Sequence, residues 1–86
     1  MAVNAYVLLT VDPGKTKSVV QTLHGVPGAI TREVLGPYDI VVELERQSIA
    51  EITGAVRDRI RSVPGVTSSI TCMWIEGPFG PHAGGD

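Results

Sequence analysis

The sequence predicts a single α+β domain in which two strand–helix–strand halves share one antiparallel sheet. The chain has 86 residues, 43% of them hydrophobic, which is enough for one core but too little chain for two. Apolar residues alternate with a period of two in some segments and recur at helical spacing in others. The tripeptide Val-Pro-Gly occurs at 26–28 and again at 63–65, each time after a helical pattern. These observations divide the chain into two similar halves.

The first half begins with a strand that runs over 3–11, where every odd position is apolar. This alternation is typical of a strand with one buried face. Asp-Pro-Gly at 12–14 is expected to end the strand and begin a helix, with Asp12 as its N-cap. A stripe of apolar residues follows, and Gly25 is the expected left-handed C-cap of this helix.

A hairpin is expected to join the two halves of the domain. Its strands cover 29–35 and 39–45, and the tetrapeptide Gly-Pro-Tyr-Asp at 36–39 forms the turn. Proline at the second position of a turn presets its φ angle. Ser48 and Glu51 then form a capping box that begins the second helix.

The second helix and the last strand complete the pattern. The apolar stripe of the helix consists of Ile49, Ile52, Val56, Ile60 and Val63. The last strand is expected over 66–75. We take 1–76 as the folded domain and 77–86, which is rich in glycine and proline and has no periodicity, as a flexible tail.

These elements form the βαββαβ pattern of a ferredoxin-like fold, a four-stranded antiparallel sheet with both helices on one face. The other face is expected to carry Tyr6, Leu8, Val41, Met73 and Ile75. Burying such a side chain is worth roughly 1.5–3 kcal/mol, so a face of this kind is rarely left in water. We therefore expect two copies to pack sheet against sheet, as in a dimeric α+β barrel, with Trp74 as an interface anchor.

Charge and composition exclude several classes of protein. The formal net charge is −2, which argues against direct nucleic-acid binding because phosphate neutralisation requires a basic surface. Arg57, Arg59 and Arg61 are interpreted as a solvated helix face. The single cysteine, Cys72, excludes an internal disulfide and is expected to be a buried, inert thiol. No apolar stretch reaches the roughly 20 residues of a membrane span, and no signal peptide is evident, so we expect a cytoplasmic protein.

Signals for catalysis are few. His24, expected at the surface near a helix end, and His82 have no partners at metal-ligand spacing. No nucleophile elbow, CxxC pair or P-loop is present. Glu43 and Glu45 share a sheet face, where an acid–base pair would lack an enclosed cleft. We therefore predict no catalytic residue, no metal and no cofactor.

The hairpin turn is the best candidate for a binding site. Tyr38 and Asp39 supply a hydroxyl and a carboxylate, and the backbone from Gly36 supplies N–H groups. A zwitterion needs such partners, N–H donors for its carboxylate and an acceptor for its ammonium group. Thr67, Ser68 and Ser69, early in the last strand, add hydroxyls at a similar level of the fold. A purely structural turn is the alternative interpretation.

Five segments together resemble the RAM domain, the effector-binding domain of Lrp/AsnC transcription regulators. They lie at 5–8, 13–15, 26–28, 36–42 and 60–66. The resemblance covers about 3–75 and implies a binding module that is not an enzyme. It also implies sheet-to-sheet dimers that close into rings of eight or ten chains, with a small amino acid bound between neighbouring dimers. Gly36, Tyr38 and Asp39 would line that site, with Ser68 and Ser69 as weaker candidates.

The winged helix-turn-helix of typical regulators is absent from the sequence, so the chain resembles the stand-alone RAM proteins. Partners implied by this resemblance are further copies of the chain and a full-length Lrp/AsnC regulator, with no DNA contact of its own. Two other classes share the topology. One is the cofactor-free monooxygenase of the dimeric α+β barrel type, for which His24 is poorly placed. The other is the ACT domain, which is usually fused to an enzyme.

Overall fold

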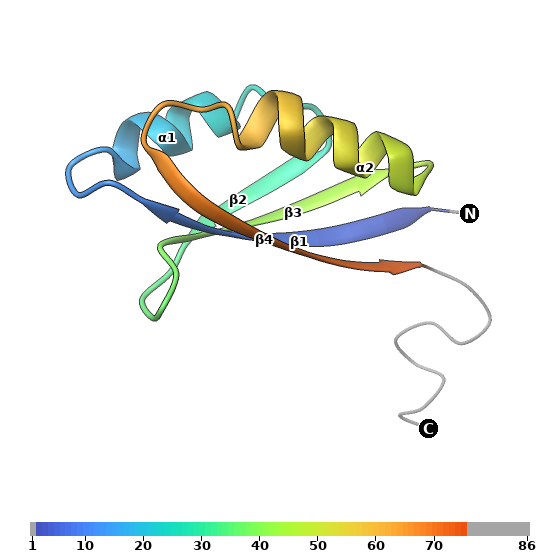
Figure 1. The fold of residues 1–86 in the computed structure, drawn as a ribbon, viewed down its shortest axis with the longest axis horizontal. Coiled ribbons are helices and arrows are strands. Elements are labelled where there is room, and N and C mark those ends of the chain that lie inside the picture. Colours follow the sequence, from blue (N-terminus) through green and yellow to red (C-terminus); the bar gives the residue numbers. More distant parts are fainter. Residues whose placement is uncertain (1, 76–86) are drawn as a thin grey trace.

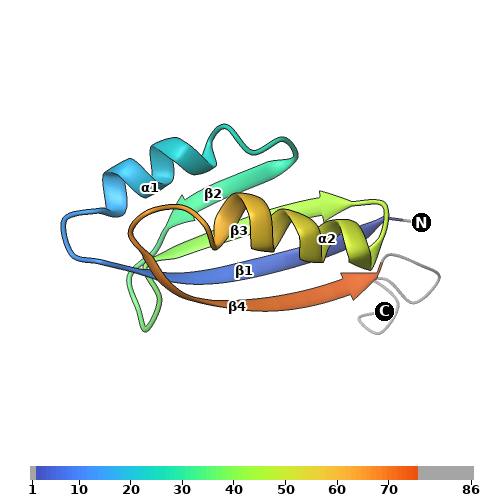
Figure 2. The same ribbon diagram turned by 45° about the horizontal axis from the view of Figure 1, so that its top comes forward.

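The computed structural model describes residues 2–75, with only the backbone of Ile75, and confirms the predicted fold class. The elements are β1 (Val3–Val11), α1 (Thr16–Leu23), β2 (Ala29–Glu33), β3 (Ile40–Arg46), α2 (Ile49–Ala55), the π-helical turn η1 (Val56–Ile60) and β4 (Val66–Ile75). The strands form one antiparallel sheet in the order β2-β3-β1-β4. Both helices lie on the same side of this sheet (Figures 1 and 2). The predicted tail at 77–86 lies outside the described residues.

The core fills the space between the sheet and the helices. The odd residues of β1 all face the helices and are buried, as their alternation predicts. The largest fully buried side chains come from both layers: Leu9, Leu23, Ile40, Leu44, Ile52, Ile60, Val7, Val19 and Val42. Within the described residues, no helix has the length and apolarity needed to cross a membrane.

The opposite face of the sheet has no covering element among residues 2–75 (Figure 1). Tyr6 on β1 lies opposite Glu43 and Cys72, and Leu8 lies opposite Val41 and Ile70. The uncovered face therefore carries the even residues of β4.

Two expectations about β4 are corrected by this register. Met73 pairs with the buried Ala5 and lies on the helix side, so its assignment to the uncovered face was wrong. Cys72 is exposed on the uncovered face and is not a buried thiol. The side chain of Ile75 lies outside the described part.

The ends of α1 differ from the sequence-based prediction. The helix begins at Thr16, and its N-cap is Lys15, with no capping side chain. Asp12 contributes its backbone, since its C=O accepts a hydrogen bond from the N–H of Lys15 (3.0 Å). Gly25 is not in the left-handed region. The left-handed glycine at this end is Gly28 (φ +74°), where the chain turns into β2.

The second helix begins as predicted and widens before it ends. Ser48 Oγ accepts a hydrogen bond from the N–H of Glu51 (3.1 Å), as the capping box requires. In η1 the N–H of Arg61 donates to the C=O of Val56 (2.7 Å), a step of five residues. Of the predicted stripe, Ile49 is 51% exposed, while Ile52, Val56 and Ile60 are buried. These three are spaced four residues apart and would drift by about 40° per step in an α-helix. The wider turn keeps the later members of the stripe on the core.

We predict that Gly65→Ala destabilises the fold by about 1–3 kcal/mol. Gly65 has φ +102°, and an added Cβ would lie 2.9 Å from Lys15 Cβ and 3.0 Å from Val19 Cγ2. Its C=O also accepts a hydrogen bond from the N–H of Asp12 (2.8 Å). Denaturant unfolding measures the loss of free energy.

Gly54→Ala is the matched control, because Gly54 lies inside α2 and an added Cβ there would meet nothing closer than 3.8 Å. This substitution should raise the free energy of unfolding by up to about 1 kcal/mol. Equal stability of the Gly65 variant and the unmodified protein would contradict the packing described.

Candidate functional site

The candidate loop lies between β2 and β3, at the end of the sheet where β1 finishes and β4 begins. The loop starts earlier than predicted, because β2 ends at Glu33 and not at Leu35. The side chain of Leu35, which therefore belongs to the loop, is fully exposed. In Figure 1 the loop extends to the side of the sheet away from the helices. The loop therefore lies beside the uncovered face.

Asp39 anchors this loop to the central strand through both its backbone and its side chain. Its N–H donates to the C=O of Leu9 (2.8 Å), and its C=O accepts from the N–H of Val34 (3.0 Å). Its Oδ2 accepts a hydrogen bond from the N–H of Val11 (2.9 Å). Oδ1 accepts no hydrogen bond from residues 2–75. Asp39 thus holds the loop with one oxygen and leaves the other available to a cation.

Gly36 and Tyr38 complete the loop. A Cβ added to Gly36 would meet no atom within 4 Å, so the backbone is open to an approaching molecule. Tyr38 is half-buried. The backbone N–H groups of Gly36 and Tyr38 donate no hydrogen bond to a described residue. The loop therefore combines unused donors with an unused carboxylate oxygen.

Ser68 lies at the same end of the sheet and joins a cluster of hydroxyl groups. Its Oγ is hydrogen-bonded to Thr10 Oγ1, and Thr67 Oγ1 donates to the C=O of Thr10 (3.1 Å). The pairing of β1 with β4 shifts at this point, between Thr10 and Val11, and such bulges are common beside functional sites. Sequence reasoning named Thr67 together with the two serines but missed that Thr10 joins them, because a bulge has no signal in the sequence of a single chain.

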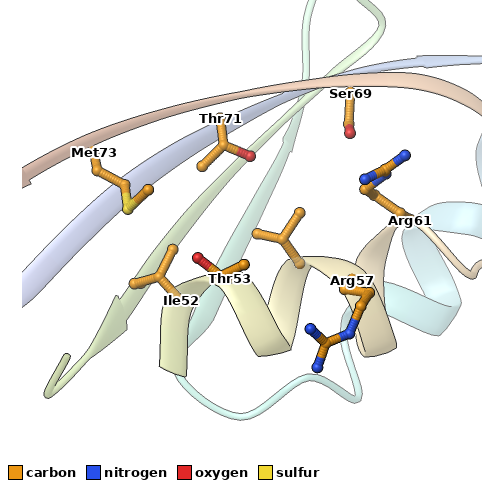
Figure 3. A pocket seen from close by; sticks show the side chains of 8 residues that line it. Ile52, Thr53, Arg57, Arg61, Ser69, Thr71 and Met73 are labelled. Atoms are coloured by element: carbon orange, nitrogen blue, oxygen red, sulfur yellow. The ribbon is translucent and has the colours of Figure 1, made fainter. Parts of the chain in front are cut away.

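Ser69 is not brought together with the loop. Successive residues of a strand point to opposite faces, and Ser69 pairs with the buried Leu9 on the helix side. Figure 3 shows it beside Arg61, at one end of a cavity under α2. Only Ser68 of the two serines lies on the face toward which the loop extends.

The remaining titratable groups lie on the surface. The three arginines of the second helix are exposed, as predicted. Arg57 donates two hydrogen bonds to Asp58 (2.9 and 3.2 Å), which lower the pKa of the Asp58 carboxyl group. His24 is exposed at the C-cap of α1. Among the described residues, no three histidine, cysteine or acidic side chains converge as metal ligands.

No protein-family model and no curated protein sequence matches the chain. Several solved structures, in contrast, superpose on the chain. The hypothetical protein PHS023 from Pyrococcus horikoshii superposes with a TM-score of 0.81 at 25% identity, covering 93% of this chain and 98% of that one. FFRP-DM1 superposes with a TM-score of 0.80 at 26% identity, covering 85% of this chain and 99% of that one.

Larger regulators contain the same fold as one part of their chain. AsnC from Escherichia coli superposes with a TM-score of 0.80 at 15% identity, covering 88% of this chain and 52% of AsnC. The transcriptional regulator NMB0573 from Neisseria meningitidis, solved as a complex with L-Met, superposes with a TM-score of 0.76 at 11% identity, covering 88% of this chain and 51% of the regulator. The structural neighbours of the chain are thus Lrp/AsnC-family proteins and small proteins matched over almost their whole length, as the resemblance to a stand-alone RAM domain predicts.

Proposed function

We propose that the chain is a non-enzymatic regulatory module that binds a small amino acid at the 34–39 loop and acts as an oligomer in the regulation of transcription. The observation that carries the proposal is the arrangement of Asp39, whose Oδ2 is fixed by the N–H of Val11 while Oδ1 has no described partner. The likeness to Lrp/AsnC regulators, one of them solved with L-Met, supports it.

The loop supplies complementary partners for a zwitterion. In this proposal Oδ1 of Asp39 accepts hydrogen bonds from an ammonium group, and charge-assisted bonds of this kind are among the stronger ones. The N–H groups of Gly36 and Tyr38, which donate to no described residue, would donate to the carboxylate of the zwitterion. Because the loop is exposed on one chain, we propose that a second chain closes the pocket. The fully exposed Leu35 fits a contact of this kind.

The uncovered face of the sheet is the proposed dimer interface. Tyr6 is 41% exposed and Ile70 is 47% exposed on this face, and the rings of Tyr6 and Trp74 lie 4.7 Å apart. Trp74 Nε1 and Asn4 Nδ2 on the same face are buried and have no partner among the described residues. A second sheet would cover the apolar side chains and bring acceptors to these donors.

Further oligomeric partners follow from the same resemblance. We propose that dimers assemble into rings of eight or ten chains, or into mixed oligomers with a full-length regulator. The cofactor-free monooxygenase alternative gains no support, because His24 lies exposed at the end of α1.

We predict that at least one of the common amino acids raises the Tm of the protein in a thermal-shift screen. A ligand at 100 times its Kd stabilises the folded state by about 2.7 kcal/mol, which for a domain of this size raises the Tm by about 10 to 20 °C. Asp39→Asn should remove the shift, because the amide lacks the charge that holds the ammonium group. If no amino acid shifts the Tm of the unmodified protein, the proposal is wrong.

The structural role of Asp39 must be separated from its role in binding. Asp39→Ala should lower the free energy of unfolding by about 1–3 kcal/mol, because the N–H of Val11 loses its acceptor. Asp39→Asn keeps an oxygen at that place and should lose about 1 kcal/mol or less. Denaturant unfolding of both variants measures the difference. Equal losses would contradict the hydrogen bond between Oδ2 and Val11.

The proposed dimer is tested by two substitutions of equally exposed isoleucines. Ile70 on the uncovered face is 47% exposed, and Ile49 on α2 is 51% exposed. Ile70→Glu should dissociate the dimer toward the 9.1 kDa monomer, because a charge without a partner would be buried in the interface. Ile49→Glu should leave the dimer intact. Sedimentation equilibrium measures both masses, and a compact monomer of the unmodified protein would overturn the interface.

A further inference from the structure

A cavity of about 290 Å³ lies between β4 and the second helix, on the face of the sheet opposite to the hydroxyl cluster around Ser68. This volume suits a small ligand. Figure 3 shows Arg61 and Ser69 at one end, Met73 and Ile52 at the other, and Thr71 between them. The cavity therefore has a cationic end with a hydroxyl group and an apolar end.

Arg61 is the cation that faces β4. Arg57 also lines the cavity, but its guanidinium group binds the Asp58 carboxylate (2.9 and 3.2 Å) and is turned away from the strand in Figure 3. The guanidinium group of Arg61 has no hydrogen bond or ion pair with a described residue. Because the N–H of Arg61 closes the five-residue step from Val56, the π turn sets the position of this side chain.

The hydroxyl groups of the cavity, like its two arginines, include some that are already hydrogen-bonded and some that are not. Thr53 Oγ1 donates to the C=O of Ile49 (3.0 Å) and is already used. Ser69 and Thr71 make no side-chain hydrogen bond with a described residue. Arg61, Ser69 and Thr71 thus place unused donors along one side of the cavity. A guanidinium fork with hydroxyl groups binds a carboxylate or a phosphate group well, and the apolar end of the cavity favours a carboxylate that carries an aliphatic chain.

No described residue that lines the cavity carries a carboxylate. The cavity is open to solvent, and an amino acid bound there would find no charged acceptor for its ammonium group beside the cationic Arg61. We propose that the cavity binds a small aliphatic monocarboxylate without an ammonium group, a 2-oxo acid or a short-chain fatty acid. Its carboxylate lies at Arg61, and its chain extends past Thr71 toward Met73 and Ile52.

Calorimetric titration with three probes that share one aliphatic chain tests the proposal. The probes are 4-methyl-2-oxopentanoate, 4-methylpentanoate and L-leucine. We expect the first two to bind, with the tighter one identifying the class, and L-leucine to leave the cavity empty. Arg61→Gln should weaken carboxylate binding by about tenfold or more.

Arg59→Gln is the control for the change in charge, because Arg59 lies in the same turn but bonds to the C=O of Gly25 (3.3 Å), away from the cavity. It should change the affinity by less than about twofold. Thr71→Val should weaken binding without changing the volume of the side chain. Asp58→Asn should strengthen binding, because it releases Arg57. Arg61, Arg59 and Asp58 are exposed, so these variants should fold.

Two outcomes would overturn the proposal. One is the absence of binding by either carboxylate to the unmodified protein at millimolar concentration. The other is equal binding of L-leucine with the same dependence on Arg61. The test is separate from that of the proposed effector site, because Asp39→Asn should leave carboxylate binding unchanged and Arg61→Gln should leave binding at the loop unchanged.

Discussion

The sheet of this protein carries apolar side chains on both faces, but within residues 2–75 helices cover only one of them. The uncovered face also carries polar groups, among them the ion pair of Arg32 with Glu43 (3.6 Å). The odd residues of β1 close the core, and its even residues place Tyr6 and Leu8 beside Ile70 on a face that residues 2–75 leave uncovered. Burial of such side chains is the dominant favourable term in association. The loop that carries Asp39 extends toward this same face. A second copy on that face would therefore determine both the stability of the domain and the surroundings of the proposed effector site.

The edge strand β4 carries the clearest support for the proposed association. Its even residues Ile70, Cys72 and Trp74 lie on the uncovered face, and the side toward α2 carries Ser69, Thr71 and Met73. A chain that folded only for itself would gain more by the reverse arrangement, because apolar area buried against the helix would add to its own core. The short side chains of Ser69 and Thr71 do not fill the space under α2. The cavity with Arg61 is the consequence.

The sequence predicted the strands, the capping box and the order of the elements, because these depend on local patterns such as alternation and turn residues. It did not predict which side of β4 faces the helices, since both sides alternate and only the register with β1 decides between them. The bulge beside Thr10 and the π turn at Val56 also depend on how segments pack. For the candidate site, the sequence singled out Gly36, Tyr38 and Asp39 as candidates, but could not show that Ser68 and Ser69 lie on opposite faces of the sheet.

Asp39 connects the proposed effector to the architecture. Its Oδ2 and its backbone bind the last residues of β1, next to the bulge where Thr10 meets Ser68. A ligand that binds Oδ1 therefore contacts the same side chain that fixes the loop against the central strand. A ligand shifts an assembly only through its different affinities for the alternative states. Since the loop alone leaves the pocket open, a state in which a second chain closes the pocket would bind the amino acid more tightly. Because of that difference in affinity, the amino acid would act on the oligomer and not on the single domain.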